Sequence, residues 1–185
     1  MRIPKSWTDK ELTISDQGLK SYICLKTSLI PHSGGRHEHR RFGKSDVHIV
    51  ERLANMFMRP GRNGGKKYRG IQIVLNALHI VQLRTAENPL QVLIRAIENS
   101  APREDVTRVT YGGITYFKAV DIAPQRRLDL ALRWLAEAAR ISSFRTPLTT
   151  EEALANELIL AASGDVRSYA IKKKNEQERV ALASR

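Results

Sequence analysis

Most of the chain after residue 45 alternates apolar and polar positions with the period of an α-helix. Apolar residues recur three or four positions apart, so each helix has one apolar face that can be buried against its neighbours. The pattern predicts helices over about 45–59, 66–87, 88–101, 124–140 and 149–163, and a last helix that begins near 169. Asn88 before Pro89, and Thr149 three residues before Glu152, are typical N-terminal capping signals. The predicted fold class is therefore mainly α, a bundle of about six helices.

Residues 105–121 interrupt this pattern near the middle of the chain. They are rich in Val, Thr, Tyr, Ile and Phe, and Gly112-Gly113 lies at their midpoint, which predicts one β-hairpin with a two-residue turn. The predicted register pairs Tyr111 with Ile114, Val109 with Tyr116, and Thr107 with Lys118. No third strand is readable, and a lone hairpin is marginally stable in water. We therefore expect the hairpin to protrude and to be held by a partner. The alternative is a hairpin that only caps the helical core through Val109 and Phe117.

The first 44 residues show little periodicity and contain several Pro and Gly residues. They predict an irregular, partly extended N-terminal arm with a short helix near Gln17–Leu25, and the arm becomes basic toward its end. The predicted domain boundaries are 1–44 for the arm and 45–185 for the helical domain with its hairpin.

Composition narrows the class of protein. The 185 residues include 31 Lys and Arg against 19 Asp and Glu, which gives a net charge of +12 and a pI near 10.2. No apolar run approaches the ~18 residues of a membrane span, and the N-terminus does not read as a secretory signal. Cys24 is the only cysteine, which excludes disulfide frameworks and thiolate zinc sites. These features predict a soluble intracellular protein with a polyanionic partner and no membrane.

The basic residues are unevenly distributed. Residues 36–69 contain ten basic residues and three acids, and residues 166–185 contain six basic residues and two acids. Residues 149–163 have three Glu and no Lys or Arg. Such segregation is typical of a protein that meets phosphate with one of its surfaces. The alternative is that the basic runs are ordinary solvated faces, but two such runs in a chain of this charge favour nucleic-acid binding.

No catalytic constellation is present in the sequence. GRNGGKK at 61–67 lacks the glycine and the hydroxyl residue that the phosphate loop of a nucleotide-binding enzyme needs. His37-Glu38-His39 does not have the spacing of a helical zinc site. We therefore predict no catalytic residue, no metal ligand and no cofactor, and a protein that is not an enzyme.

Two groups of basic residues are favoured for phosphate contact by their positions. Lys66, Lys67 and Arg69 stand at the start of a predicted helix, where cations oppose the helix dipole, and this placement is easier to understand if phosphate lies there. Arg126 and Arg127 begin another helix and have no carboxylate four residues away. Both groups are therefore candidates for RNA contact.

Five segments, which together cover most of the chain after about residue 30, carry a specific family likeness. They are PHSGGRHEHRRFGKSDVHIVERL at 31–53, IVERLANMFMRPGRNGGKK at 49–67, ENPLQVLIRAIENSAPREDVTR at 87–108, AVDIAPQRRLDLALRWLAEAAR at 119–140 and SYAIKKKNEQERVA at 168–181. With these segments the chain resembles the small-subunit ribosomal protein seven family, in its archaeal and eukaryotic branch. The resemblance implies a helical bundle with a protruding β-hairpin, in agreement with the pattern described above.

The resemblance also implies a function. It implies a cytoplasmic, ribosomal protein that binds the 3′ major (head) domain of small-subunit ribosomal RNA (rRNA), nucleates head assembly, and contacts neighbouring small-subunit proteins of the head and platform. The residues implied to bind rRNA are Arg36, Arg40, Arg41, Arg59, Arg62, Asn63, Lys66, Lys67, Arg69, Arg103, Arg108, Arg126 and Arg127. The hairpin tip at Tyr111, Gly112 and Gly113 is implied to lie near the exit-site transfer RNA (tRNA) and the messenger RNA (mRNA). An alternative from another class is a free DNA- or RNA-binding regulator built on a helical bundle, which would usually dimerise and read base edges.

Overall fold

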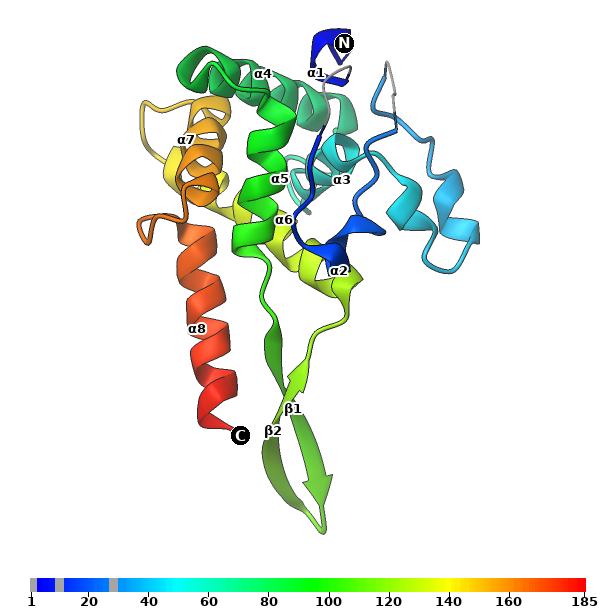
Figure 1. The fold of residues 1–185 in the computed structure, drawn as a ribbon, viewed down its shortest axis with the longest axis vertical. Coiled ribbons are helices and arrows are strands. Elements are labelled where there is room, and N and C mark those ends of the chain that lie inside the picture. Colours follow the sequence, from blue (N-terminus) through cyan, green and yellow to red (C-terminus); the bar gives the residue numbers. More distant parts are fainter. Residues whose placement is uncertain (1–2, 9–11, 27–29) are drawn as a thin grey trace.

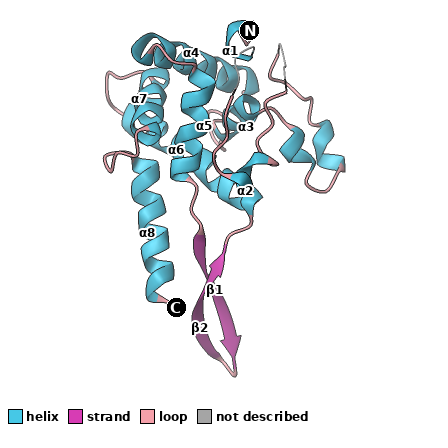
Figure 2. Cartoon of the chain, in the orientation of Figure 1, coloured by secondary structure: helices cyan, strands magenta, loops and turns pink. Residues whose placement is uncertain are grey.

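Helices pack side by side in one part of the molecule, and a β-hairpin projects away from them (Figure 1). The computed structural model describes residues 3–8, 12–26 and 30–185, so parts of the predicted arm lie outside the described residues. The helices are α1 (Lys5–Thr8), α2 (Gln17–Lys20), α3 (Ile49–Met56), α4 (Lys67–Thr85), α5 (Pro89–Ser100), α6 (Pro124–Ser143), α7 (Thr150–Ala162) and α8 (Tyr169–Ala183). Two 3₁₀ turns, η1 (Arg36–His39) and η2 (Gly43–Asp46), precede α3, and the strands are β1 (Glu104–Tyr111) and β2 (Ile114–Asp121). The predicted mainly α fold class is confirmed, with α3 to α8 as the six predicted helices (Figure 2).

The hydrophobic core lies among α4, α5, α6 and α7, where α7 packs against each of the other three helices. Leu78, Leu93, Leu132 and Leu158 supply one fully buried side chain from each of these helices. Each buried leucine stabilises the fold by about 1.5–3 kcal/mol relative to an exposed one. The apolar faces predicted from periodicity therefore form the core. In the described part of the chain, no helix is long and apolar enough to cross a membrane.

Side-chain capping fixes the starts of α5 and α7, the two helices for which the sequence contains N-terminal capping signals. At α7, Thr149 Oγ1 accepts from the backbone N–H of Glu152, and the Glu152 carboxylate accepts from the backbone N–H of Thr149. At α5, the Asn88 side chain accepts from the backbone N–H of Leu90, and Pro89 occupies the first turn. Both predicted caps are confirmed.

The boundaries of α3 and α4 differ from the predicted ones. Helix α3 begins at Ile49 instead of 45, because residues 43–46 form η2 and His48 provides the helix cap by accepting from the backbone N–H of Val50. Helix α4 begins at Lys67, so its predicted start among Lys66 to Arg69 is confirmed, but it ends at Thr85 instead of about 87. Gly70 allows α4 to cross α3 closely, since a Cβ at this position would lie 2.7 Å from the carbonyl oxygen of Ala54.

The described part of the N-terminal segment is packed against the bundle. Trp7 and Leu19 are buried in the same core as the helices, and the Trp7 indole N–H donates to Gln82 Oε1 at 2.9 Å. The predicted short helix is α2, which ends at Lys20 instead of Leu25. This segment therefore contributes to the stability of the bundle, and the division of the chain at residue 44 stays a prediction.

The hairpin has the predicted register. Tyr111 pairs with Ile114, Val109 with Tyr116, and Thr107 with Lys118. Gly112 and Gly113 both have positive φ, as the two-residue turn requires. At the base of the hairpin, Arg185 after α8 forms an ion pair with Glu104. Phe117 is 56% exposed, so the alternative in which Phe117 docks on the helical core is wrong.

Candidate RNA interface

The segment that contains η1 and η2 presents free cations on a fixed support. Arg36, Arg40 and Arg41 are exposed and form no ion pair with any described residue. Lys44 in the same segment forms an ion pair with Asp129 of α6, which fastens the segment to the bundle. The three arginines therefore project from a fixed backbone and are available to phosphate.

The glycine-rich loop before α4 presents a second group of free cations. Arg62, Lys66 and Arg69 are exposed and form no ion pair within the described residues, and Asn63 is exposed beside them. Arg59, which precedes the loop, lies 3.7 Å from Glu137 of α6 and is partly neutralised. The six exposed cations Arg36, Arg40, Arg41, Arg62, Lys66 and Arg69 are hereafter called the basic surface.

Lys67, by contrast, is committed to an intramolecular contact. Its ammonium group donates to Glu51 of α3, whose residue exposure is 2%. Glu51 Oε1 also accepts from the backbone N–H of Ser33 at 2.8 Å and from the Ser33 hydroxyl at 2.7 Å. Burial raises the pKa of Glu51, but the hydrogen bonds from Lys67 and Ser33 outweigh this effect and hold the pKa below its ordinary value. Lys67 therefore serves the fold, and its cationic position at the helix start is explained without RNA.

Glu51 joins the two parts of the basic surface. Ser33 precedes η1 and Lys67 begins α4, and one carboxylate oxygen binds both. The buried carboxylate consequently fixes the free arginines after Ser33 relative to the free cations beside Lys67. Sequence reasoning missed this role because an acid within a basic segment resembles any solvated acid.

The predicted arginines at the base of the hairpin are paired with acids from other elements. Arg127 lies 2.8 Å from Asp16 and also donates to the carbonyl oxygen of Pro102. Arg126 lies 3.2 Å from Asp105 on β1, although its side chain is 65% exposed. Asp16 is partly buried, which raises its pKa, but the hydrogen bond and charge of Arg127 outweigh burial and lower the pKa overall. The position of these arginines at a helix start therefore did not reveal that acids from other elements pair with them.

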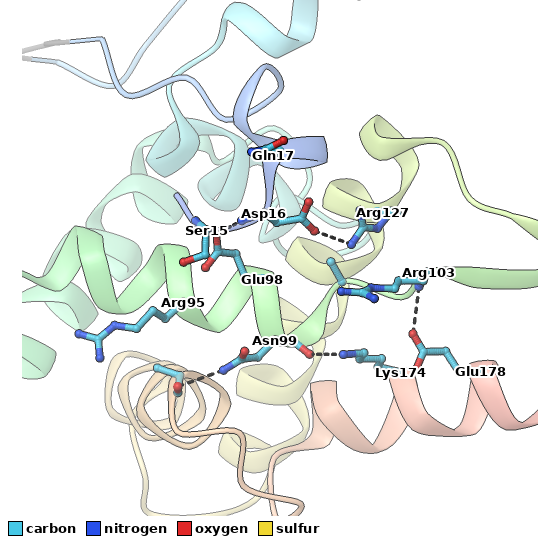
Figure 3. A pocket seen from close by; sticks show the side chains of 12 residues that line it. Ser15, Asp16, Gln17, Arg95, Glu98, Asn99, Arg103, Arg127, Lys174 and Glu178 are labelled. Atoms are coloured by element: carbon cyan, nitrogen blue, oxygen red, sulfur yellow. Dashed lines mark hydrogen bonds and ion pairs between the residues drawn. The ribbon is translucent and has the colours of Figure 1, made fainter. Parts of the chain in front are cut away.

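A polar cavity of about 830 Å³ lies beside Arg103 and Arg127, between the N-terminal segment, α5 and α8 (Figure 3). Its wall also carries Asp16, Glu98 and Glu178, so acids and bases alternate there. Several of these groups are hydrogen-bonded within the protein: Glu98 accepts from the backbone N–H groups of Ser15 and Asp16, Glu178 accepts from that of Arg103, and Lys174 donates to Asn99 O. This cavity therefore joins three parts of the fold and lacks the uniform positive charge of the basic surface.

The run Lys172–Lys174 divides among three environments. Lys174 is bound to the end of α5, Lys173 lies 2.8 Å from Glu176, and Lys172 is exposed. The run is therefore not a continuous cationic patch.

The hairpin carries the remaining predicted residues at a different end of the molecule from η1 and η2 (Figure 1). The Arg108 guanidinium lies over the Phe117 ring, 5.5 Å from its centroid, and this pair joins the two strands on one face. Tyr111 is 70% exposed, and Gly112 and Gly113 are exposed beside it. Most of the predicted site residues thus fall into three separate groups: the basic surface with Asn63 beside it, the hairpin base and the hairpin tip. Arg59, Lys67 and Arg108 lie outside these groups. No group of three or more His, Cys, Asp or Glu suited to a metal ion occurs among the described residues.

Comparison with known proteins gives one consistent family. The family profile of ribosomal protein S7p/S5e matches residues 19–185. The small ribosomal subunit protein uS7 of Methanothermobacter thermautotrophicus is 51% identical over 178 residues, which cover 96% of each chain. That of Methanosphaera stadtmanae is 50% identical over 178 residues, covering 96% of this chain and 95% of its own. That of Nanoarchaeum equitans is 45% identical over 196 residues, covering 100% of this chain and 99% of its own.

Proposed function

Because the chain belongs to the ribosomal protein S7p/S5e family, we propose that it is a structural constituent of the small ribosomal subunit in the cytoplasm. The predicted family resemblance is confirmed, and it extends over nearly the whole chain. These three archaeal relatives all carry the name of a small-subunit ribosomal protein. We therefore assign to this chain a structural and not an enzymatic role.

The basic surface is the observation that best supports RNA binding. Six exposed cations stand on two segments that one buried carboxylate joins, so their spacing is set before RNA arrives. Backbone segments that are held in place in advance lose less conformational freedom when RNA binds. We assign to this surface the contact with the 3′ major domain of rRNA, through which the protein nucleates assembly of the subunit head.

The hairpin tip serves other partners in this proposal, while the hairpin base adds to the rRNA contact. The exposed tip at Tyr111 to Gly113 reaches beyond the bundle. We assign to this tip the proximity to the exit-site tRNA and the mRNA. Arg103 and Arg126 are exposed and Arg127 is paired with Asp16. All three lie where the hairpin leaves the bundle, and we assign to them rRNA contacts of lower strength. Neighbouring proteins of the head and platform complete the set of partners.

Sedimentation of the native protein, followed by cross-linking to RNA, tests the proposed function. We expect the protein to migrate with small subunits and its cross-links to map within the 3′ major domain. Migration as a free dimer, with binding to DNA or to an unrelated RNA, would support the regulator instead. Co-migration with cross-links confined to another rRNA domain would keep the ribosomal role and overturn the assignment to the head.

A further inference from the structure

A second cavity, of about 260 Å³, lies between the start of α3 and the segment that contains η1. Its wall includes Cys24, Lys26, Arg36, Asp46, His48 and Glu51. Of these six residues, Arg36 alone belongs to the predicted rRNA-binding set. The cavity therefore adjoins the basic surface but is built largely from residues with no assigned role.

His48 is one of the residues that line this cavity, and it carries an unused hydrogen-bond donor. The residue is 5% exposed, and its Nδ1 accepts from the backbone N–H of Val50 at 3.2 Å. Burial lowers the pKa of His48 more than the charge of Glu51 raises it, which favours the neutral ring. Since Nδ1 accepts a hydrogen bond, the proton of the neutral ring lies on Nε2. Nε2 has almost no surface open to water and no partner in the described part of the chain. A buried donor without an acceptor is costly, and such groups are rare in folded proteins.

The charges around the cavity favour an anion. The carboxylate of Glu51 is already engaged by Lys67 and Ser33, so it contributes little repulsion. Arg36 and Lys26 are exposed at the wall, whereas Asp46 is the exposed acid that opposes them. The N-terminus of α3 adds the positive end of a helix dipole.

We propose that this cavity receives a backbone phosphate of RNA, with His48 Nε2 as a neutral donor and Arg36 and Lys26 as flanking cations. The inference rests on the proposed rRNA-binding function and adds a site to it. The wall opens slightly to admit the phosphate, since Nε2 is sealed from water in the free protein. Binding then satisfies the donor that the fold leaves without a partner.

The variant His48→Asn separates the donor from the helix cap. The Asn side-chain oxygen can accept the Val50 N–H as His48 Nδ1 does, but nothing replaces Nε2. We expect the fold to be retained, the melting temperature to change by only a few degrees, and the affinity for a 3′ major domain rRNA fragment to fall about tenfold. The dependence of affinity on salt should not change, because a neutral donor releases no counterion.

Three further variants provide the comparison. Arg36→Ala and Lys26→Ala should each lower the log–log slope of affinity against salt by roughly 0.7 to 0.9, since each removes a cation. Thr149→Asn places an Asn cap on α7, on another part of the bundle, and should bind the fragment like the wild-type chain. Phosphate-ethylation interference should identify one phosphate whose modification weakens RNA binding by the wild-type protein but not by the His48→Asn variant.

The outcomes distinguish the two proposals. A folded His48→Asn with wild-type affinity, or the absence of such a phosphate, would overturn the cavity site and leave rRNA binding intact. A wild-type chain that does not prefer the fragment to an unrelated RNA of equal length would overturn the proposed function itself.

Discussion

The basic surface and the hairpin both face solvent, but the bundle supports them in different ways. Beneath the basic surface, Glu51 binds Ser33 and Lys67, and the buried Arg52 lies 2.8 Å from Asp129. The hairpin is attached to the bundle near its base, and its distal half is exposed on both strands. Buried polar contacts resist local opening, whereas a lone ribbon opens at little cost. Under the proposed function, we therefore expect the basic surface to be shaped before RNA binds and the hairpin to take its final shape on its partner.

Truncation of a core leucine should have the largest effect, because both regions depend on the bundle. Leu132 is fully buried in the middle of α6. We expect Leu132→Ala to lower the free energy of unfolding by roughly 2 to 5 kcal/mol, against about 0.5 kcal/mol or less for Tyr111→Ala at the exposed tip. Chemical denaturation of both variants measures this difference. Equal losses would show that the tip is packed and would remove the contrast between the regions.

Replacement of Lys67 should distinguish a role in stabilising the fold from a role in RNA contact. Lys67→Ala leaves the buried Glu51 without its cation, so we expect a loss of about 1–3 kcal/mol in the free energy of unfolding. Lys66→Ala, on the exposed neighbour, is the matched control and should cost less than about 0.5 kcal/mol. Neither lysine lies on the apolar face of α4, so apolar periodicity alone does not predict this difference. Equal melting temperatures for the two variants would contradict the support role.

The variant Glu51→Gln tests whether Glu51 supports the basic surface, because its charge and its positioning role predict opposite changes in RNA affinity. Removal of a negative charge near the basic surface would tighten RNA binding if electrostatics alone acted. Because Glu51 also fixes the arginines after Ser33, we expect weaker binding to the rRNA fragment instead. Leu132→Val, a destabilised control far from the RNA, should bind normally at the same temperature. Tighter binding by Glu51→Gln would show that the carboxylate does not position the surface.

The pKa of Glu51 adds a dependence on pH. Its pKa in the folded state is lower than the ordinary value of 4.5, so its contribution to stability is complete above that pH and is lost as the pH falls below it. The free energy of unfolding of the wild-type chain should therefore fall more steeply than that of Glu51→Gln on acidification below pH 4.5. Parallel curves would indicate that the carboxylate has no preferential partner in the folded state.

Lys66, the exposed lysine beside Lys67, should affect the affinity for RNA but not the stability of the fold. Lys66→Ala removes one free cation of the basic surface, so the log–log slope of affinity against salt should decrease by roughly 0.7 to 0.9. Titrations at several salt concentrations measure the slope. An unchanged slope would place Lys66 outside the RNA contact.

Deletion of the hairpin tip should have the smallest effect on the bundle. A short turn in place of Thr110–Thr115 removes exposed residues and leaves the ion pair of Glu104 with Arg185 in place. We expect the melting temperature and the affinity for the rRNA fragment to stay near wild type, and reading-frame maintenance to suffer in ribosomes that carry the variant. A collapse of fragment affinity with normal frameshifting would instead make the hairpin an rRNA anchor.

The features that could be predicted from the sequence depend on residues close together in the chain. The hairpin register follows from Gly112-Gly113 and the residues around it, and the cap of α7 follows from Thr149 and Glu152, three positions apart. The apolar faces follow from helical periodicity within each segment. The fold class could therefore be predicted in full.

The contacts that decide which basic side chains are paired within the protein could not be predicted from local sequence patterns. Glu51 meets a serine 18 positions before it and a lysine 16 positions after it, and Arg127 meets an aspartate 111 positions away. Nothing in the local pattern distinguishes Lys67 from Lys66, or Arg127 from Arg126. Whether a cation is free for RNA is decided by tertiary packing, which periodicity within one helix does not contain.

The pairing of Asp16 with Arg127 has a consequence for the order of events during synthesis. The N-terminal segment leaves the translating ribosome first, but its partner on α6 follows 111 residues later. At about 5–20 residues per second, that interval is on the order of 5 to 20 s. Throughout it, Trp7, Leu19 and Ile23 have no completed core to enter. The nascent chain therefore spends seconds with apolar and cationic residues exposed together.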